Sequence, residues 1–204
     1  MKKLAVLLLV GVMAFSSVAC GNSGETGKNT QQNSQGTNNK AEQKVEVKNT
    51  TDLLTKVWET YGEDEKFYGI GGDYNNVVEN APGKFDIADT ESLEQRLCFP
   101  EDAVSYIDEA SSLFHGMMAN NFSCGAYHVK EKANMQMVVE QIKERTLNNQ
   151  WMCGFPQNLV IITVGDEYVV SAFGSTDIIE NFKVKLTDVY GDTAKVAVDL
   201  SLAE

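Results

Sequence analysis

The chain has few of the residue types from which most catalytic and metal sites are built. It contains two histidines and four cysteines in 204 residues. No cysteine pair has the C-x-x-C spacing, which excludes a thioredoxin-type redox motif, and no serine stands in a G-x-S-x-G motif. The cysteines after Cys20 are Cys98, Cys124 and Cys153. Three thiols cannot all pair within one chain. One disulfide with one free thiol, or three reduced and buried thiols that behave as small hydrophobes, both fit this count. We expect no essential disulfide, and the sequence identifies no catalytic residue and no cofactor.

Basic residues are also scarce. The chain has 17 Lys and Arg against 29 Asp and Glu, a formal net charge of −12. Within residues 51–204 the counts are 11 and 26, which gives −15. Phosphate binding requires a basic face, so we expect no nucleic-acid partner. Close docking on anionic lipid is disfavoured for the same reason. The charge permits a cationic ligand or a basic partner, and it also keeps an exported protein soluble.

The longest apolar run is too short to span a membrane. Leu4–Phe15 falls below the roughly 20 apolar residues that a span needs. Two lysines precede the run, and small residues lead from it into Cys20, which is the pattern of a secretory signal peptide. It resembles a bacterial lipobox, although Ser17 stands where leucine is usual. We predict a lipoprotein signal peptide over residues 1–19. Cys20 then carries the lipid that holds the protein at the extracytoplasmic face of the cell membrane.

A polar segment follows the predicted anchor. Residues 20–50 contain no aromatic residue and are dominated by Gly, Asn, Gln, Ser, Thr and Lys. Such a segment buries too little apolar surface to offset its chain entropy. We expect a lipid anchor and disordered linker over residues 20–50, with a reach of about 30 Å from 5–6 Å × √n. Residues 51–204 then form a single domain of ordinary size.

Helical and strand patterns alternate along this domain. The predicted helices begin at Thr50 or Thr51, Asp89, Pro100, Asn134 and Ser175, and the predicted strands span 122–129, 159–164, 168–173 and 194–200, the last as an edge strand. Gly165-Asp166-Glu167 separates two β-rich runs and predicts a hairpin. The order is N-terminal helices followed by strand–helix–hairpin–helix. We predict an α+β fold with helices packed on one face of a small sheet.

Two motifs offer ligands for metal ions. Cys124 and His128 are four residues apart on a predicted strand, so both side chains lie on one face. Cys153 or His115 would extend this set, but structural zinc sites use ligands paired at short spacings, and none are present. We therefore expect no metal site and a half-buried strand histidine at position 128.

A glycine-rich stretch, residues 68–73, is the second motif of this kind. It lacks the G-x-G-x-x-G spacing and the Walker lysine of phosphate-binding loops, so its glycines favour turns with positive φ. Asp73 and Asn75 begin like a calcium loop, but the glycine and final glutamate of that loop are missing. We expect a loop without a bound ion.

Neighbouring carboxylates raise the question of catalysis. Glu101 and Asp102 offer the pair of acids on which glycan hydrolysis depends. Both also stand at the start of a predicted helix, where acidic side chains stabilise the helix dipole. The sequence leaves hydrolysis as an alternative function.

Aromatic residues gather in the loop-rich first half of the domain. Phe67, Tyr68 and Tyr74 stand among glycines. Exposed aromatic rings in such a loop form a binding face for a peptide, a glycan or an envelope protein. The alternative is that these rings close the core over the sheet. Tyr68, Tyr74 and Phe67 are the candidate binding face.

Four segments carry a resemblance to a known family: PEDAVSYI (100–107), SCGAYHVKE (123–131), MQMVVEQIKER (135–145) and NLVIITVGDEYVVSAF (158–173). With the signal peptide and the linker, they resemble small lipoproteins of clostridial-type bacteria that carry the domain of unknown function 4358. The resemblance covers residues 51–190 and consists of aliphatic and turn patterns. It implies a fold and an extracytoplasmic location, and it supplies no catalytic residue.

The sequence therefore predicts a membrane-anchored extracytoplasmic lipoprotein, with a non-catalytic binding or scaffolding role in the cell envelope. One alternative is a ligand-capturing accessory protein of a transporter, which requires a defined pocket. The other is a carboxylate-based envelope hydrolase, which requires two acidic side chains that face each other across a cleft.

Overall fold

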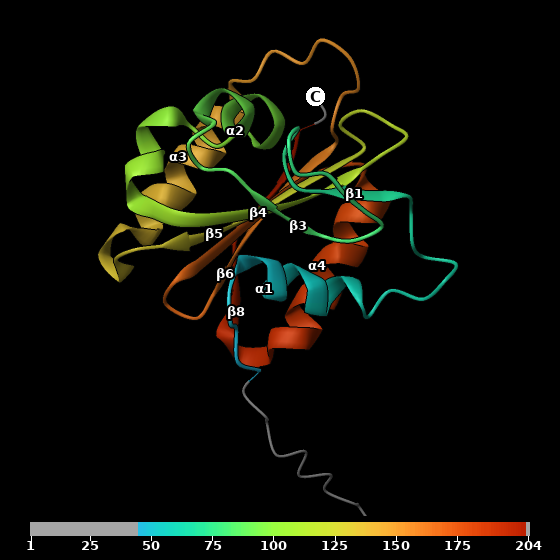
Figure 1. The fold of residues 1–204 in the computed structure, drawn as a ribbon, viewed down its shortest axis with the longest axis horizontal. Helices are drawn as coiled ribbons and strands as arrows, with labels where there is room; N and C mark the ends of the chain where they lie inside the picture. Colours follow the sequence, from blue (N-terminus) through green and yellow to red (C-terminus); the bar gives the residue numbers. More distant parts are fainter. Residues whose placement is uncertain (1–44, 203–204) are drawn as a thin grey trace, which may run out of the picture. The chain divides into compact units, whose positions relative to one another are not determined.

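An eight-stranded antiparallel sheet forms the middle layer of the structure, and helices lie on both of its faces (Figure 1). The computed structural model describes residues 45–202; the predicted signal peptide, Cys20 and the linker up to residue 44 lie outside them. The elements in chain order are α1 (Thr50–Trp58), β1 (Gly69–Gly71), β2 (Val78–Glu79), β3 (Gly83–Phe85), α2 (Thr90–Leu97), η1 (Glu101–Tyr106), β4 (Ile107–His115), β5 (Phe122–Val129), η2 (Lys132–Asn134), α3 (Met135–Leu147), β6 (Asn158–Val164), β7 (Tyr168–Gly174), α4 (Thr176–Tyr190), η3 (Gly191–Thr193) and β8 (Ala194–Ser201).

The strands follow the order β2-β1-β4-β5-β7-β6-β8, and β3 also pairs with β4. β1 lies opposite residues 113–115 of β4, and β3 lies opposite residues 110–112. The predicted hairpin is confirmed, because β6 and β7 pair directly across the turn at residues 165–167. Gly165 has a φ of 62°, which glycine adopts without steric cost. β8 is an edge strand, as predicted.

The α+β class and the order strand–helix–hairpin–helix from β5 to α4 are confirmed. The prediction that the helices pack on one face is corrected. α2 and α3 cover one face, where they form the first core, and α1 and α4 cover the other, where they form the second core. In β6, Leu159 and Ile161 enter the first core, while Val160 and Ile162 enter the second. An uninterrupted apolar run of this kind is typical of a strand buried on both faces.

The start of the domain also differs from the prediction. Asn49, not a threonine, caps α1, and its Oδ1 accepts a hydrogen bond of 2.7 Å from the Asp52 N–H. Thr50 is buried instead, with its Oγ1 2.8 Å from Ser111 Oγ. Val45 and Val47 are partly buried against the second core. The folded part therefore includes the last residues of the predicted linker.

β4 is the largest feature that the sequence analysis missed. Pro100 precedes η1, a 3₁₀ helix rather than an α-helix, and Ile107 begins β4 instead of continuing that helix. Buried Ser112 donates a hydrogen bond of 2.9 Å to the Gly72 carbonyl, and buried Ser111 pairs with Thr50. The two serines make the segment look too polar for a buried strand when it is read by itself. Their hydroxyl groups are hydrogen-bonded by residues that are distant in the sequence, which allows them to be buried.

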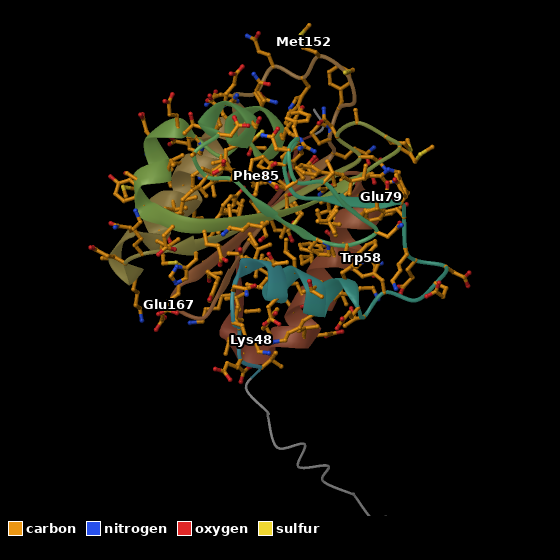
Figure 2. All side chains as sticks on the ribbon, in the orientation of Figure 1. Lys48, Trp58, Glu79, Phe85, Met152 and Glu167 are labelled. Carbon is orange, nitrogen blue, oxygen red and sulfur yellow. The ribbon has the colours of Figure 1, made fainter. Side chains whose placement is uncertain are left out.

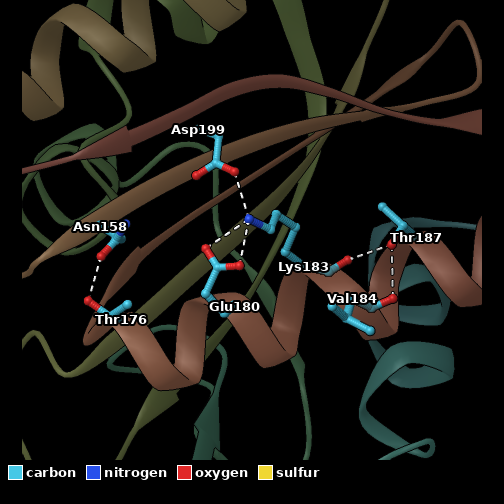
Figure 3. A network of polar contacts seen from close by, with 7 residues as sticks. All are labelled: Asn158, Thr176, Glu180, Lys183, Val184, Thr187 and Asp199. Atoms are coloured by element: carbon cyan, nitrogen blue, oxygen red, sulfur yellow. Dashed lines mark hydrogen bonds and ion pairs between the residues drawn. The ribbon is translucent and has the colours of Figure 1, made fainter.

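Figure 3 shows how α4 is joined to the sheet. Lys183 Nζ lies 2.6 Å from Asp199 of β8 and 2.7 Å from Glu180 one turn away. The hydrogen bonds that Lys183 donates to Asp199 and Glu180 raise the pKa of Lys183 above its usual value. Thr176, at the start of α4, donates to Asn158 Oδ1 at 2.7 Å. The Lys183–Asp199 ion pair joins α4 to the edge strand β8, and the Thr176–Asn158 hydrogen bond joins the start of α4 to β6.

No helix within residues 45–202 is long and apolar enough to cross a bilayer.

Candidate functional site

Phe67 is the most enclosed of the three residues of the candidate binding face. Its ring centre lies 5.0 Å from that of Trp58 and 5.2 Å from that of Phe122. It also stacks on His115, with ring centres 5.0 Å apart and planes 15° apart. Phe67 is only partly exposed. This position agrees with the alternative interpretation, in which the aromatic ring closes the core.

Tyr68 and Tyr74 are exposed, at 39% and 66% of their surfaces. The Tyr68 carbonyl accepts a hydrogen bond of 2.8 Å from the N–H of Gly116, which places Tyr68 beside the loop after β4. Tyr74 lies against α2, where its ring covers the side chain of Arg96. The two tyrosines are therefore available to a partner, whereas Phe67 supports the surface from below.

Arg96, in the last turn of α2, is the charged group at the centre of this surface. Its guanidinium carbon lies 4.0 Å from the ring centre of Phe114, 4.5 Å from that of Tyr74 and 5.9 Å from that of Phe85. A cation within about 6 Å of a ring centre is attracted by the ring's quadrupole. The rings hold the guanidinium in place. Unlike a carboxylate, they do not accept conventional hydrogen bonds from its N–H groups, so these donors stay available.

No carboxylate pairs with Arg96 within residues 45–202, and none of its N–H groups has a hydrogen-bond acceptor in that range. Burial lowers the pKa of Arg96, and the nearby Tyr74 and Asp73 oppose this only in part. The other arginine of the chain offers a contrast. Arg145 Nε lies 2.8 Å from Glu94 Oε1, and its Nη1 donates to Asn149 at 2.8 Å. One arginine is therefore used in the fold, and the other keeps its donors unused.

A surface pocket of about 270 Å³ opens beside Arg96. Its lining residues are Tyr74, Gln95, Arg96, Phe114, His115, Ala119, Asn120, Phe122 and Ser123. The set contains no Asp and no Glu, although the domain is strongly acidic. One cation, several neutral polar groups and aromatic walls suit an anionic group attached to an apolar body.

His115 contributes a neutral donor to this pocket. Its Nδ1 accepts hydrogen bonds of 3.2 Å from the N–H groups of Met117 and Met118. With Nδ1 as acceptor, these partners assign the ring proton to Nε2. Burial lowers the pKa of His115, which favours the neutral ring. His115 therefore adds a hydrogen-bond donor rather than a second charge.

Two loops extend the pocket with apolar side chains. Asn120 Nδ2 donates to the carbonyls of Cys153 and Gly154, at 2.7 and 3.1 Å, and so joins residues 116–121 to residues 148–157. We call these segments the paired loops. Their four large exposed apolar side chains are Met117 (75% exposed), Met118 (56%), Met152 (90%) and Phe155 (75%). Such a cluster is typical of a protein-binding surface.

The paired loops belong to uncharged parts of the chain. Residues 110–129 and 146–165 contain no Asp, Glu, Lys or Arg. Figure 2 shows Met152 at one end of the domain and Lys48, close to where the described chain begins, at the opposite end. The pocket and the paired loops share residues 119 and 120. They therefore form one continuous surface, which we call the distal face.

The larger pocket of the described residues lies elsewhere. It measures about 530 Å³ and is lined in part by Val45, Val47 and Lys195, together with several acidic residues. It surrounds the segment through which the chain enters the domain. A third pocket, of about 340 Å³, lies beside Asp73. Each contains an exposed lysine, Lys195 in the first and Lys84 in the second, beside acidic side chains. Arg96 is instead half-buried in a pocket without acidic residues, so we base the candidate site on the Arg96 pocket.

Asp73 has a structural role. It is 1% exposed, and its carboxylate accepts N–H bonds from Asn75, Asn76 and Asp86 at 2.7 to 3.0 Å. Burial alone would raise the pKa of Asp73, but these hydrogen bonds outweigh it and lower the pKa. Gly72 has a φ of 83°, as predicted for a turn glycine. Asp73, which begins the calcium-like pattern, therefore stabilises the turn through hydrogen bonds to its backbone.

The zinc ligands considered from the sequence do not come together. Within residues 45–202 no three His, Cys, Asp or Glu side chains are placed to hold a metal ion. Cys124 is buried in the second core, while Cys153 is exposed in the paired loops, and all three cysteines of this part are free. His128 is a half-buried strand histidine, as predicted, with its Nδ1 2.5 Å from Asp108 Oδ1.

The carboxylate pair considered for hydrolysis is exposed. Glu101 and Asp102 are adjacent on η1, in its first turn. Neither lines any of the three pockets. Their position agrees with the structural interpretation, in which acids stabilise the start of a helix.

Comparisons with known proteins give no relative for this chain. No family model, no curated protein and no solved structure matches it. The resemblance to lipoproteins with the domain of unknown function 4358 stays a prediction.

Sequence reasoning found Tyr74 and missed Arg96. Arg96 lies in a helix whose acidic neighbours suggest a solvated ion pair, so its lack of a carboxylate partner appears only when the structure brings Phe114 and Tyr74 around it. One signal was available in the sequence. The charge-free stretches 110–129 and 146–165 are unusual in a chain with 23% charged residues.

Proposed function

We propose that this protein is a non-catalytic binding module of the bacterial cell envelope, anchored by lipid on Cys20 at the extracytoplasmic face of the membrane. The observation that carries the binding role is Arg96, a half-buried cation without a carboxylate partner in the described residues. It stands in a pocket without acidic side chains, within a domain of strongly negative charge. The anchoring role is supported by the pattern of residues 1–20.

An unpaired, partly buried charge is costly to a fold. A charged group taken from water loses hydration that aromatic rings replace only in part. Groups of this kind are retained where a ligand supplies the missing partner, as part of the usual trade between stability and function. Met152 of the distal face lies at the opposite end of the domain from Lys48, near which the described chain begins (Figure 2). That position suits the capture of a partner beyond the membrane surface.

The test is ligand-observed NMR on the exported full-length protein. Saturation transfer is measured to a peptide digest of bacterial envelope proteins mixed with a muramidase digest of cell wall. We expect at least one component to bind wild-type protein and Arg145→Met, and to lose its signal with Arg96→Met. Absence of any binding component, or binding that survives Arg96→Met, would contradict the proposed function.

A further inference from the structure

The charge of the Arg96 pocket selects the anion that it takes. Arg96 is its one formally charged lining residue, so one positive charge is available. The surrounding domain opposes anions in general, and it opposes a doubly charged phosphate more than a singly charged carboxylate. The planar guanidinium also presents two parallel N–H donors that match the two oxygens of a carboxylate. The charge of the pocket and the shape of the guanidinium therefore both favour a carboxylate.

The neutral polar groups of the pocket fit the same ligand. His115 offers an Nε2–H donor, because its Nδ1 is occupied by the backbone of the paired loops. Gln95 and Asn120 also line the pocket with side-chain amides. Gln95 Nε2 donates one hydrogen bond to Glu91 and Asn120 Nδ2 donates to the loop after α3, so both amide oxygens and one N–H of Gln95 stay available. Amides next to a carboxylate site suit the backbone N–H and C=O groups of a peptide.

The size of the pocket indicates the end of a longer ligand. Pockets that enclose a whole drug-sized molecule measure about 300–1,000 Å³, and this one measures about 270 Å³. The rest of such a ligand would continue over the paired loops, where Met117, Met152 and Phe155 are exposed. Methionine and phenylalanine side chains adapt to varied apolar partners. The residues next to the carboxylate would therefore be apolar.

We propose that the distal face binds the C-terminal end of a peptide: the free carboxylate pairs with Arg96, and apolar last residues lie on the paired loops. This inference rests on the proposed function and names its ligand class. Lysines further back in the peptide strengthen binding, because they meet a domain with a formal charge of −15 over residues 51–204.

The experiment is calorimetric titration of the exported full-length protein with the acetylated hexapeptide Lys-Lys-Gly-Ala-Leu-Phe. One arm uses the free acid and the other its C-terminal amide. We expect the amide to bind at least about tenfold more weakly, because a charge-assisted pair is lost. Arg96→Met should weaken the free acid at least tenfold and leave the amide unchanged. Arg96→Lys keeps the charge but lacks the two parallel N–H donors, so its affinity for the free acid should lie between those of wild type and Arg96→Met. Arg145→Met should bind the free acid like wild type.

Equal affinity for the acid and the amide would overturn the inference, as would full competition by inorganic phosphate at equal concentration. Circular dichroism of each variant shows that a loss of binding is not a loss of fold. The two proposals fail separately. If the NMR test finds an Arg96-dependent ligand while the acid and amide peptides bind alike, the site exists and the carboxylate assignment is wrong. If the NMR test finds none, the proposed function fails.

Discussion

The guanidinium carbon of Arg96 lies 4.0 Å from the ring centre of Phe114, which belongs to the first core. Tyr74 approaches the same guanidinium from the surface, at 4.5 Å. The cation therefore stands between a fixed wall and an exposed ring. Its place is set by the packing of α2 on the sheet, while its hydrogen-bond donors remain available. A binding group held on a rigid helix needs little rearrangement to receive its ligand.

Tyr74 and Phe67 should separate binding from folding. Tyr74→Ala removes an exposed ring, so we expect the free energy of unfolding to change by less than about 1 kcal/mol and peptide affinity to fall several-fold. Phe67→Ala removes packing on Trp58, Phe122 and His115. It should cost about 2 kcal/mol of stability. Urea unfolding and calorimetry measure the two quantities. A Tyr74→Ala variant with wild-type affinity and lowered stability would assign that ring to the fold.

Gly154 should control the paired loops. A Cβ at this position would lie 2.2 Å from the Ala119 carbonyl oxygen, and its φ of +69° already disfavours side chains. Gly154→Ala should lower stability by about 1–3 kcal/mol and reduce peptide affinity. Gly165→Ala is the matched control, since its φ is +62° but nothing lies within 4 Å of the added Cβ. If both variants bind peptide like wild type, the paired loops are not part of the binding surface.

Buried thiols should make the domain sensitive to alkali. Burial raises the pKa of Cys98 to about 11, above its ordinary value of 9.0. The folded state therefore keeps a proton that the unfolded state releases, so this contribution is complete below pH 9 and is lost as pH rises towards 11. The loss from this thiol is at most about 3 kcal/mol. Urea midpoints at pH 8, 9.5 and 10.5 measure it. Cys98→Ala should decline less steeply than wild type, and parallel curves would refute the prediction.

Cys20 should determine where the protein is found. Wild-type protein expressed in a bacterial host is expected to incorporate radiolabelled palmitate and to fractionate with membranes. Cys20→Ser should incorporate none and should appear in the soluble fraction. Cys153→Ser, which changes an exposed thiol of the domain, is the control and should behave as wild type. Label on the Cys20→Ser variant would show that the lipid is attached elsewhere.

The second half of the fold was predictable from the sequence because its signals are local. β5 has the predicted bounds, and the hairpin and the helix before Gly191 follow turn and periodicity rules. β4 was not predictable in this way, because Ser111 and Ser112 are buried through contacts with Thr50 and Gly72. The residues of the strand alone do not show that these distant partners are available.

The candidate site also contains residues that the sequence indicated and one residue that it did not. Tyr68 and Tyr74 stand among glycines, and their exposure is one of the two alternatives that the local composition left open. Arg96 looked like an ordinary helix-surface residue, because the sequence does not show which arginine finds a carboxylate. Arg145 finds Glu94, which lies 51 residues away, and Arg96 finds aromatic rings instead. Only the tertiary arrangement distinguishes them.

The most direct measurement observes the Arg96 side chain itself. The chain has two arginines, Arg96 and Arg145, so a nitrogen–proton NMR spectrum of labelled protein contains two arginine Nε–H signals, which the Arg145→Met variant assigns. Adding the free-acid hexapeptide should shift the Arg96 signal and slow its exchange with water, while the Arg145 signal stays in place. The amide peptide should leave both unchanged. An Arg96 signal unmoved by saturating free acid would contradict the account.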